Sequence, residues 1–543
     1  MMLRTPQRRR SGVILLAVLI VIALLMLIGY KYFNLMNAEL EGAVAANKII
    51  QARRLADSGL HYAQFVLAYP ETAGLTTEAS SRFAAPFLAY DNADLFHQRP
   101  VVDAAGNIVG YFSLVSPRTA DDPYVTQFGY RFGVEDESSK INLNWLLRLN
   151  RQDSSGERAR DLIARLPYMS TELAMSITNW LQSGSDAGDA MYYAAMGYGP
   201  KYGPLESLEE LLYIRGITPR LLLGNDRNRN GVLDPDEDDA GGLIDPGLAQ
   251  YFTVYSRELN VDSTGQPRLN INDSNLQTAY DQLTAYLGPD LAGFIMAYRR
   301  WGPRQARSPR TPPGGSTTIE IIEGGPDSAD LDLGGADSSS MVAVSSLWSL
   351  VDAQVQAPPT SASGSGGGGS GGQQVTTIYR SPLQSSKPEV LQQYLPILFD
   401  KFTTDERYEL PARININTAP ADVVQVLPGI TTADVQKILA ARPAPGAIDP
   451  SQAASFNSPA WLMIQAQVSA ASMRQWEPYI TTRSQVYRVQ AVGYFEVGGP
   501  MVRLEAVIDV NAGRPRLLYW RDISELGRGY PFSQPKPILL QDK

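Results

Sequence analysis

The segment from Asp226 to Glu237 holds the side chains whose types and spacing most clearly indicate chemistry. Oxygen-bearing side chains occupy loop positions 1, 3, 5, 9 and 12, and glycine occupies position 6. This spacing matches an EF-hand loop, because calcium takes roughly six to eight oxygen ligands and the glycine permits the sharp turn. The sequence predicts calcium as a cofactor, with five side chains and the backbone carbonyl of position 7 as ligands: Asp226, Asn228, Asn230, Asp234, Glu237 and Val232.

The residues that follow this loop differ from those of an EF-hand. Gly241, Gly242 and Pro246 stand where the exiting helix should run, and both residue types disfavour a helix interior. The sequence therefore predicts a solitary EF-like loop rather than half of a paired calcium sensor. The alternative is a surface turn that binds no metal, since Asn and Asp favour turns by themselves.

The remaining composition excludes most enzyme chemistry. Cysteine is absent and histidine occurs only at His61 and His97, which removes disulfides, thiolate metal sites, Cys nucleophiles and most His-based acid–base catalysis. The chain has no Gly-x-Ser-x-Gly, phosphate-loop or dinucleotide motif, so we predict that it is not an enzyme. Adjacent carboxylates, such as those of residues 135–137, are predicted to be solvated charges at turns or helix starts.

Length and charge set further limits. A chain of 543 residues is too long for one core and predicts two to four domains. Its 47 Lys and Arg against 56 Asp and Glu give a formal net charge of −9. Binding to nucleic acid would therefore need a local basic patch, and none of any size is evident beyond the first ten residues.

The first seventy residues predict a membrane anchor that continues as a helix. Four arginines precede the eighteen uncharged residues 13–30, which are long enough to span a bilayer. The arginines should remain cytoplasmic, which places the rest of the chain across the membrane. Apolar residues at helical spacing continue to about Tyr69 without a proline. The alternatives are a cleaved signal sequence and an anchor followed by a separate soluble helix.

Strand patterns occur at both ends of the remaining chain. Residues 101–115 read as a hairpin and 127–134 as its neighbour, whereas comparable strands return only at 485–494, 502–510 and 516–520. Three late strands alone would be poorly supported. We therefore predict one α+β domain with a small antiparallel sheet, in which residues 137–478 form a large, mainly helical insertion.

Within this insertion a five-residue pattern recurs at 140–144, 268–272 and 413–417. Each copy is a basic residue, then Leu or Ile, Asn, Leu or Ile, and a second Asn. The turns at 214–218 and 427–431 accompany it, and the units read as helix-hairpin-helix (SAM-like) motifs, with Asn capping a helix and Gly turning the chain. Such turns can bind phosphates. Here Thr218 and Thr431 replace the second glycine and cations are few, so we predict structural packing and no nucleic-acid partner.

Composition also predicts a linker at 303–378, which is rich in Gly, Ser and Pro. Within it, 317–322 and 341–355 are apolar and are expected to dock as a strand and a helix, the alternative being that they too are disordered. The predicted organisation begins with a leader (1–12), a membrane helix (13–30) that continues as a helix to 69, and the first part of the α+β domain (70–136). A first helical unit with the calcium loop (137–302), the linker (303–378) and a second helical unit (379–478) follow. The closing strands of the domain (479–523) and a tail (524–543) come last.

Several of these features together resemble the type IV pilin-like proteins. They are the short basic leader ending at Gly12, the apolar helix starting at Val13, and the segment 51–60. Most such proteins carry glutamate at the fifth mature position, which here is Ala17. The branch without that glutamate is the K-type minor pseudopilin of type II secretion systems, which the segments 135–144, 177–181, 205–217 and 414–430 also resemble.

This resemblance implies a function and a location. A prepilin peptidase would cut between Gly12 and Val13, leaving a single-pass inner-membrane protein with a cytoplasmic N-terminus and a periplasmic globular domain. The expected role is a non-catalytic component at the tip of the secretion pseudopilus, supporting protein export. Its partners would be other minor pseudopilins and the major pseudopilin, and the family's calcium binding agrees with the loop at 226–237. The alternative function is a membrane-tethered helix-hairpin-helix protein for DNA binding or uptake.

Overall fold

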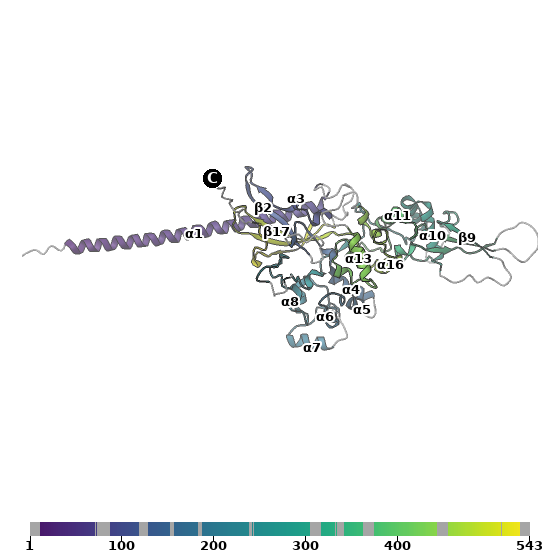
Figure 1. Cartoon of the computed structure of the whole chain (residues 1–543), viewed down its shortest axis with the longest axis horizontal. Coiled ribbons are helices and arrows are strands. Elements are labelled where there is room, and N and C mark those ends of the chain that lie inside the picture. Colours follow the sequence, from purple (N-terminus) through teal and green to yellow (C-terminus); the bar gives the residue numbers. More distant parts are fainter. Residues whose placement is uncertain are drawn as a thin grey trace, which may run out of the picture.

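A long N-terminal helix leads into a mixed body of helices and sheets in the computed structural model of Figure 1. The structure describes fourteen stretches of the chain: 11–70, 72, 87–118, 129–152, 157–182, 187–237, 242, 244–304, 317–331, 333, 341–361, 374–442, 454–511 and 513–532. The arginines of the predicted leader, the Gly/Ser run 363–372 and the last part of the predicted tail lie outside these residues.

Helix α1 (Ser11–Ala68) is continuous over 58 residues, or about 87 Å at 1.5 Å per residue. Residues 13–51 are exposed along their whole length, and the N-terminal part is long and apolar enough to cross a membrane. From Ala52 onward the helix buries one face against the body of the protein. The predicted single helix is confirmed, and it ends one residue before the predicted Tyr69.

The buried part of α1 covers one face of an antiparallel sheet. The sheet has the order β1-β2-β17-β18-β19, with β3 beside β2 and β4 beside β17. Its strands come from both ends of the chain, so the late strands complete the early hairpin as predicted. The strand bounds are Arg99–Val102 (β1), Ile108–Pro117 (β2), Tyr130–Arg131 (β3), Glu135–Asp136 (β4), Val486–Tyr494 (β17), Val502–Asp509 (β18) and Arg516–Asp522 (β19).

Side chains of the central strands alternate between two buried faces. Val489 and Ala491 join the core beneath α1, whereas Arg488 and Gln490 point toward the inserted region and bind its residues. Close packing with α1 requires small residues. A Cβ on Gly493 would lie 2.2 Å from the Ala52 carbonyl oxygen, so only glycine fits between this strand and the helix.

The region between β4 and β17 is built from three closed lobes, which we call lobe A (141–253), lobe B (269–403) and lobe C (414–481). Each lobe begins and ends in a two-residue parallel bridge. The paired dipeptides are Ile141–Asn142 (β5) with Phe252–Thr253 (β6), Leu269–Asn270 (β8) with Phe402–Thr403 (β13), and Ile414–Asn415 (β15) with Ile480–Thr481 (β16).

The recurring asparagines form equivalent hydrogen bonds in the three lobes. The first asparagine of each copy accepts a hydrogen bond from the backbone N–H two residues later, at 2.9–3.1 Å, which turns the chain out of the bridge. The second asparagine holds a distant segment of its own lobe. Asn144 exchanges two hydrogen bonds with Leu205, and Asn272 exchanges two with Val344.

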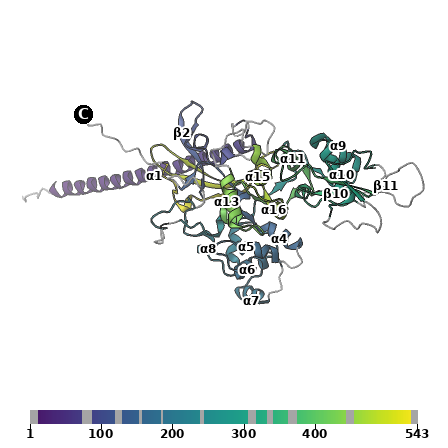
Figure 2. The ribbon, with the colours of Figure 1, turned by 45° about the vertical axis from the view of Figure 1, so that its right-hand side comes forward.

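Lobe B is set apart from the other two lobes by a short stem. Strand β7 (Glu258–Leu259) pairs antiparallel with β14 (Glu409–Leu410), and lobe B follows at the end of this pair. Figures 1 and 2 show its elements α9, α10 and α11 at the end of the molecule far from the exposed part of α1. These helices span Leu276–Leu287, Pro289–Trp301 and Pro388–Lys401.

Lobe B also contains the two apolar segments that were expected to dock. Strand β9 (Thr317–Glu323) pairs parallel with β12 (Gln374–Arg380), so a strand forms at 317–322 as predicted. The segment 341–355 differs from the predicted helix. It contains only the 3₁₀ turn η5 (Leu347–Leu350) and the start of β10 (Gln354–Gln356), which pairs with β12.

The other lobes consist of short helices. Lobe A contains α4 to α8 and the 3₁₀ helices η2 and η3: Leu143–Gln152, Glu157–Ile163, Thr171–Leu181, Ala187–Met196, Pro219–Leu223, Leu208–Tyr213 and Leu248–Gln250. Lobe C contains α12, α13, α15, α16 and η6: Ala421–Val424, Thr432–Ala441, Ala460–Ile464, Ala470–Trp476 and Ala454–Asn457. Two further short helices, α2 (Phe87–Tyr90) and α3 (Ala93–Phe96), precede β1.

Candidate metal-binding loop

The loop 226–237 follows α8 in lobe A and lies against the sheet. Thr218 caps α8 by accepting a hydrogen bond from the Leu221 N–H at 3.2 Å. Gly224, with φ of +66°, ends the helix and turns the chain into the loop. Gly231 also has a positive φ, of +71°, and a Cβ there would lie 2.8 Å from Pro117 on β2. The predicted need for glycine at loop position 6 is therefore met by both conformation and space.

Asp226 and Glu237, the first and last predicted ligands, hold the loop closed through backbone hydrogen bonds. The Asp226 carboxylate accepts from Asn230 N–H at 3.0 Å and from Gly231 N–H at 2.9 Å. The Glu237 carboxylate accepts from Arg227 N–H at 2.7 Å, from Asn228 N–H at 3.1 Å and from Asp234 N–H at 3.3 Å. Both carboxylates thus point inward, to the concave side of the loop.

Both of these carboxylates are buried without a cationic side chain at ion-pair distance among the described residues. Asp226 is 6% exposed and Glu237 is 4% exposed. Burial raises the pKa of Asp226 and the negative charge of Glu237 adds to the rise, while the N–H groups of Gly231 and Asn230 and the charge of Arg503 oppose it. Two buried carboxylates without an ion-pair partner are costly even when backbone N–H groups bind them. A bound divalent cation would supply the missing positive charge, so this donor pair fits calcium.

The three side-chain ligands between these carboxylates, Asn228, Asn230 and Asp234, bind one another. The amide NH₂ groups of Asn228 and Asn230 both donate to Asp234 Oδ2, at 2.5 and 3.0 Å. The Oδ1 atoms of these asparagines accept backbone N–H groups of Asn230 and Val232. Within the described residues, no three carboxylate or imidazole groups are placed together as a metal site. Calcium binding by all six predicted ligands would therefore require Asp234 to turn toward the Asp226 and Glu237 carboxylates.

Contacts with the sheet fix the backbone of the loop. Arg503 on β18 donates to the Asn228 carbonyl at 2.8 Å, and Gln490 on β17 donates to the Arg229 carbonyl at 2.8 Å. The Asn230 amide donates to the Gly529 carbonyl at 2.6 Å. The loop therefore joins lobe A, the sheet and the last described segment of the chain.

The predicted processing residues Gly12 and Val13 lie in the first turn of α1. Val13 is 72% exposed, and Ala17 follows one turn later on the same exposed part of the helix. This end of α1 is exposed, as are all residues from 13 to 51.

The two threonines in the predicted hairpin turns are helix caps. Gly429 has φ of +67°, and Thr431 after it forms a capping box with Asp434 at the start of α13. Thr218 plays the equivalent part at α8, after Gly216 with φ of +87°. A side-chain oxygen here satisfies helix N–H groups that would otherwise be open to a phosphate.

The carboxylates of residues 135–137 lie at a helix start, as one of the two predicted alternatives states, because Asp136 caps the 3₁₀ helix η1 (Glu137–Ser139). The other alternative, that they are solvated, is wrong, since Asp136 is 1% exposed and Glu137 is fully buried. Glu137 forms an ion pair with Arg488 on β17. Asp136 accepts hydrogen bonds from residues of three segments. The Asp136 donors are Ser138 N–H, the Asn415 amide, and the hydroxyls of Thr418 and Ser484.

The prediction failed because these partners lie hundreds of positions away. A run of acidic residues normally indicates a solvated surface, and local sequence contains no sign of Arg488 or Asn415. The one available signal was the repeat itself, since Asn415 belongs to its third copy.

Comparison with known proteins adds no family assignment, since no family model, no curated protein and no solved structure matches the chain.

Proposed function

We propose that the protein is a K-type minor pseudopilin of a type II secretion system. The observation that carries the proposal is the continuity of α1, which passes without a break from a membrane-length apolar segment into the core of a sheet domain. A helix of this kind can be anchored in a bilayer, or packed among neighbouring helices of a filament, while its other half carries the globular domain. The lack of an identifiable catalytic constellation in the sequence agrees with a structural role.

The proposed location is the inner membrane, with the N-terminus in the cytoplasm and the body in the periplasm. The four leader arginines favour this orientation. The proposed partners are the prepilin peptidase, which would cut between Gly12 and Val13, and the other minor and major pseudopilins, which would pack along the exposed part of α1.

The proposed position in the filament is its tip. Ala17 cannot form the ion pair with a neighbouring N-terminal amine that glutamate would form in lipid. Lobes A, B and C also add a large mass to the sheet domain. Figure 1 shows lobe B at the end of the molecule away from the exposed helix, and helices α6, α7 and α8 of lobe A projecting to one side of the sheet. A subunit of this shape suits the end of a filament, where no further subunit must stack above it.

The proposed cofactor is calcium in the loop 226–237. Asp226 and Glu237 would contribute charge, Asn228, Asn230 and the Val232 carbonyl neutral oxygens, and Asp234 a further ligand. Because the loop binds β17, β18 and residue 529, an occupied loop would stabilise the joint between lobe A and the sheet.

The decisive experiment for this function is N-terminal sequencing with intact mass of the protein extracted from membranes. We expect the mature chain to begin at Val13, and the same protein from cells lacking prepilin peptidase to retain Met1. A chain that keeps Met1 in cells with the peptidase, or one cut after the apolar run, would refute the assignment.

A further inference from the structure

A cavity of about 570 Å³ lies where lobes B and C meet the stem. Its wall is formed by η5 and β13 of lobe B, by α16 and the end of lobe C, and by residues beside β7 and β14. Cavities of this size hold small organic molecules. Neither the calcium loop nor α1 contributes a residue to it, so it is a separate site.

Basic side chains outnumber acidic ones around this cavity. Five arginines line it, namely Arg268, Arg407, Arg413, Arg474 and Arg483, against the three acids Glu258, Asp405 and Glu477. Glu258 is paired with Arg413, which donates two hydrogen bonds of 2.6 and 3.0 Å to its carboxylate. Asp405 is likewise paired with Arg407.

Two arginines are left with weak partners. Arg474 has a single hydrogen bond of 3.5 Å, to the Trp348 carbonyl, and no acidic partner within the described part of the chain. Arg268 reaches Glu258 only at 3.9 Å and otherwise donates to the Asp400 carbonyl. Burial and the nearby charges of Arg483 and Arg413 lower the pKa of Arg268 to about 9, as expected where cations crowd together.

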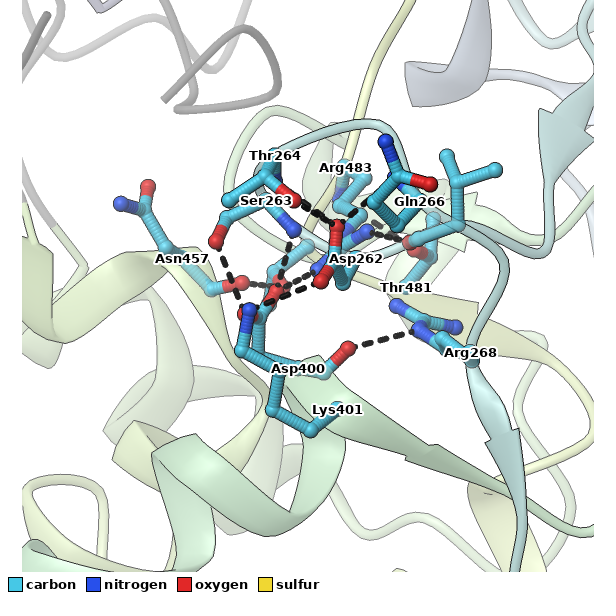
Figure 3. A network of polar contacts seen from close by, with 12 residues as sticks. Asp262, Ser263, Thr264, Gln266, Arg268, Asp400, Lys401, Asn457, Thr481 and Arg483 are labelled. Carbon is cyan, nitrogen blue, oxygen red and sulfur yellow. Dashed lines mark hydrogen bonds and ion pairs between the residues drawn. The ribbon is translucent and has the colours of Figure 1, made fainter. Parts of the chain in front are cut away.

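Figure 3 shows how Asp400, the nearest acid outside the wall, is engaged. Asp400 accepts hydrogen bonds from Arg483 and from the backbone and hydroxyl of Ser263, and it also pairs with Lys401. Its carboxylate therefore pairs with Arg483 but not with Arg268 or Arg474 among the described contacts. Four arginines then remain against the three acids of the wall, so the cavity carries more positive than negative charge.

Apolar side chains form part of the wall. Trp348 and Phe399 both line the cavity, with ring centroids 4.5 Å apart. Trp348 is fully buried, and its indole N–H is not exposed to the cavity, so the more open ring of Phe399 presents the apolar surface.

We propose that this cavity binds a small organic carboxylate with an apolar body. Arg268 and Arg474 offer charge-assisted hydrogen bonds to the carboxylate, and the apolar wall beside Phe399 accommodates the apolar part. A bare inorganic anion would leave that wall unfilled, and a neutral ligand would leave the arginines unpaired. The proposal does not depend on the pseudopilin function.

The test measures binding of 4-phenylbutyrate to the full chain in nanodiscs by equilibrium dialysis, with empty nanodiscs as the blank. We expect saturable binding that is lost with the neutral 4-phenylbutyramide and that sulfate competes for only weakly. Arg474→Gln should weaken binding about tenfold or more, because it removes a charge-assisted hydrogen bond from an exposed position that the fold does not require.

A control variant makes the test specific. Arg514→Gln, an exposed arginine away from the cavity, should leave binding unchanged. Absence of saturable binding, equal binding of the amide, or an affinity of Arg474→Gln equal to that of wild type would each overturn the proposal.

Discussion

Asp136 joins segments that lie far apart in the sequence. Its carboxylate binds Asn415 and Thr418 at the start of lobe C and Ser484 at its exit, while its own backbone belongs to β4 of the sheet. Losing any one of these donors would leave a buried acceptor only partly satisfied. This single residue therefore fixes lobe C to the sheet.

The ionisation of Asp136 should make stability depend on pH. Burial raises its pKa from 3.8 to about 6. Between these values the folded chain holds a proton that the unfolded chain has released. The stabilisation is therefore fully present below about pH 4 and is lost as the pH rises through 6.

The variant Asp136→Asn isolates this effect because it stays neutral. Subtracting its free energy of unfolding from that of wild type should give a difference that falls by about 2 kcal/mol between pH 4 and pH 7. Urea titrations followed by tryptophan fluorescence would measure it. Parallel pH profiles for the two proteins would show that Asp136 ionises as an exposed carboxyl does.

The predicted calcium ligands can be tested at the same scale. Asp226→Ala and Glu237→Ala should abolish the rise in melting temperature on adding calcium, which corresponds to about 2.7 kcal/mol when calcium is at a hundred times its Kd. The exposed neighbour Asp236 provides the control, since Asp236→Ala changes the charge but no proposed ligand. If wild type melted at the same temperature in calcium and in chelator, the assignment of calcium to this loop would be wrong.

The EF-like spacing could be read from the sequence because all six proposed ligands lie within twelve residues. The local pattern therefore predicted the turn at Gly231 and the inward Asp226 and Glu237. It could not predict that Asn228 and Asn230 would bind Asp234, or that Arg503 and Gln490 would hold the loop from the sheet. The contacts of Arg503 and Gln490 come from β18 and β17, which lie more than two hundred residues further along the chain. The contacts of Asn228 and Asn230 with Asp234 are local, but residue spacing does not determine how these side chains are oriented.

At the scale of elements, α1 and the sheet were predictable and the lobes were only partly so. Helical periodicity and the absence of proline defined α1, and strand alternation defined β2, β17 and β18. The three repeat copies were visible, but their partners in β6, β13 and β16 are only a large apolar residue followed by threonine, Phe-Thr twice and Ile-Thr once. Two-residue bridges are too short to carry a periodic signal, so the closure of each lobe could not be foreseen.

The packing of α1 on β17 leads to a prediction at Gly493. Gly493→Ala would place a Cβ 2.2 Å from the Ala52 carbonyl oxygen, so helix and strand must separate. We expect a loss of about 2 kcal/mol in the free energy of unfolding. Gly42→Ala in the exposed part of α1 is the matched control, because nothing lies within 4 Å of its Cβ. Equal stability of Gly493→Ala and wild type would mean that the two elements are less closely packed.

For the whole molecule, the proposed tip position predicts an asymmetric set of neighbours. Photo-crosslinkers placed one at a time on the exposed part of α1, for example at Ile22, Leu40 and Ile50, should capture minor pseudopilins. They should capture the major subunit from at most one side. Crosslinks to major subunits both above and below, with this protein as abundant as they are, would rule out the tip.

The closed form of lobe B has a consequence for how such a chain can change during evolution. Its parallel bridge pairs Leu269 with Phe402 on adjacent strands, roughly 5 Å apart, and the antiparallel pair β7–β14 lies next to it along the chain. The chain thus enters and leaves the lobe at adjacent points, while α11 and η5 of the lobe also pack on α15 and α16 of lobe C. Gain or loss of the lobe in one genetic event would leave α1, β7 and β14 in place, but it would uncover the faces of α15 and α16 that the lobe now covers.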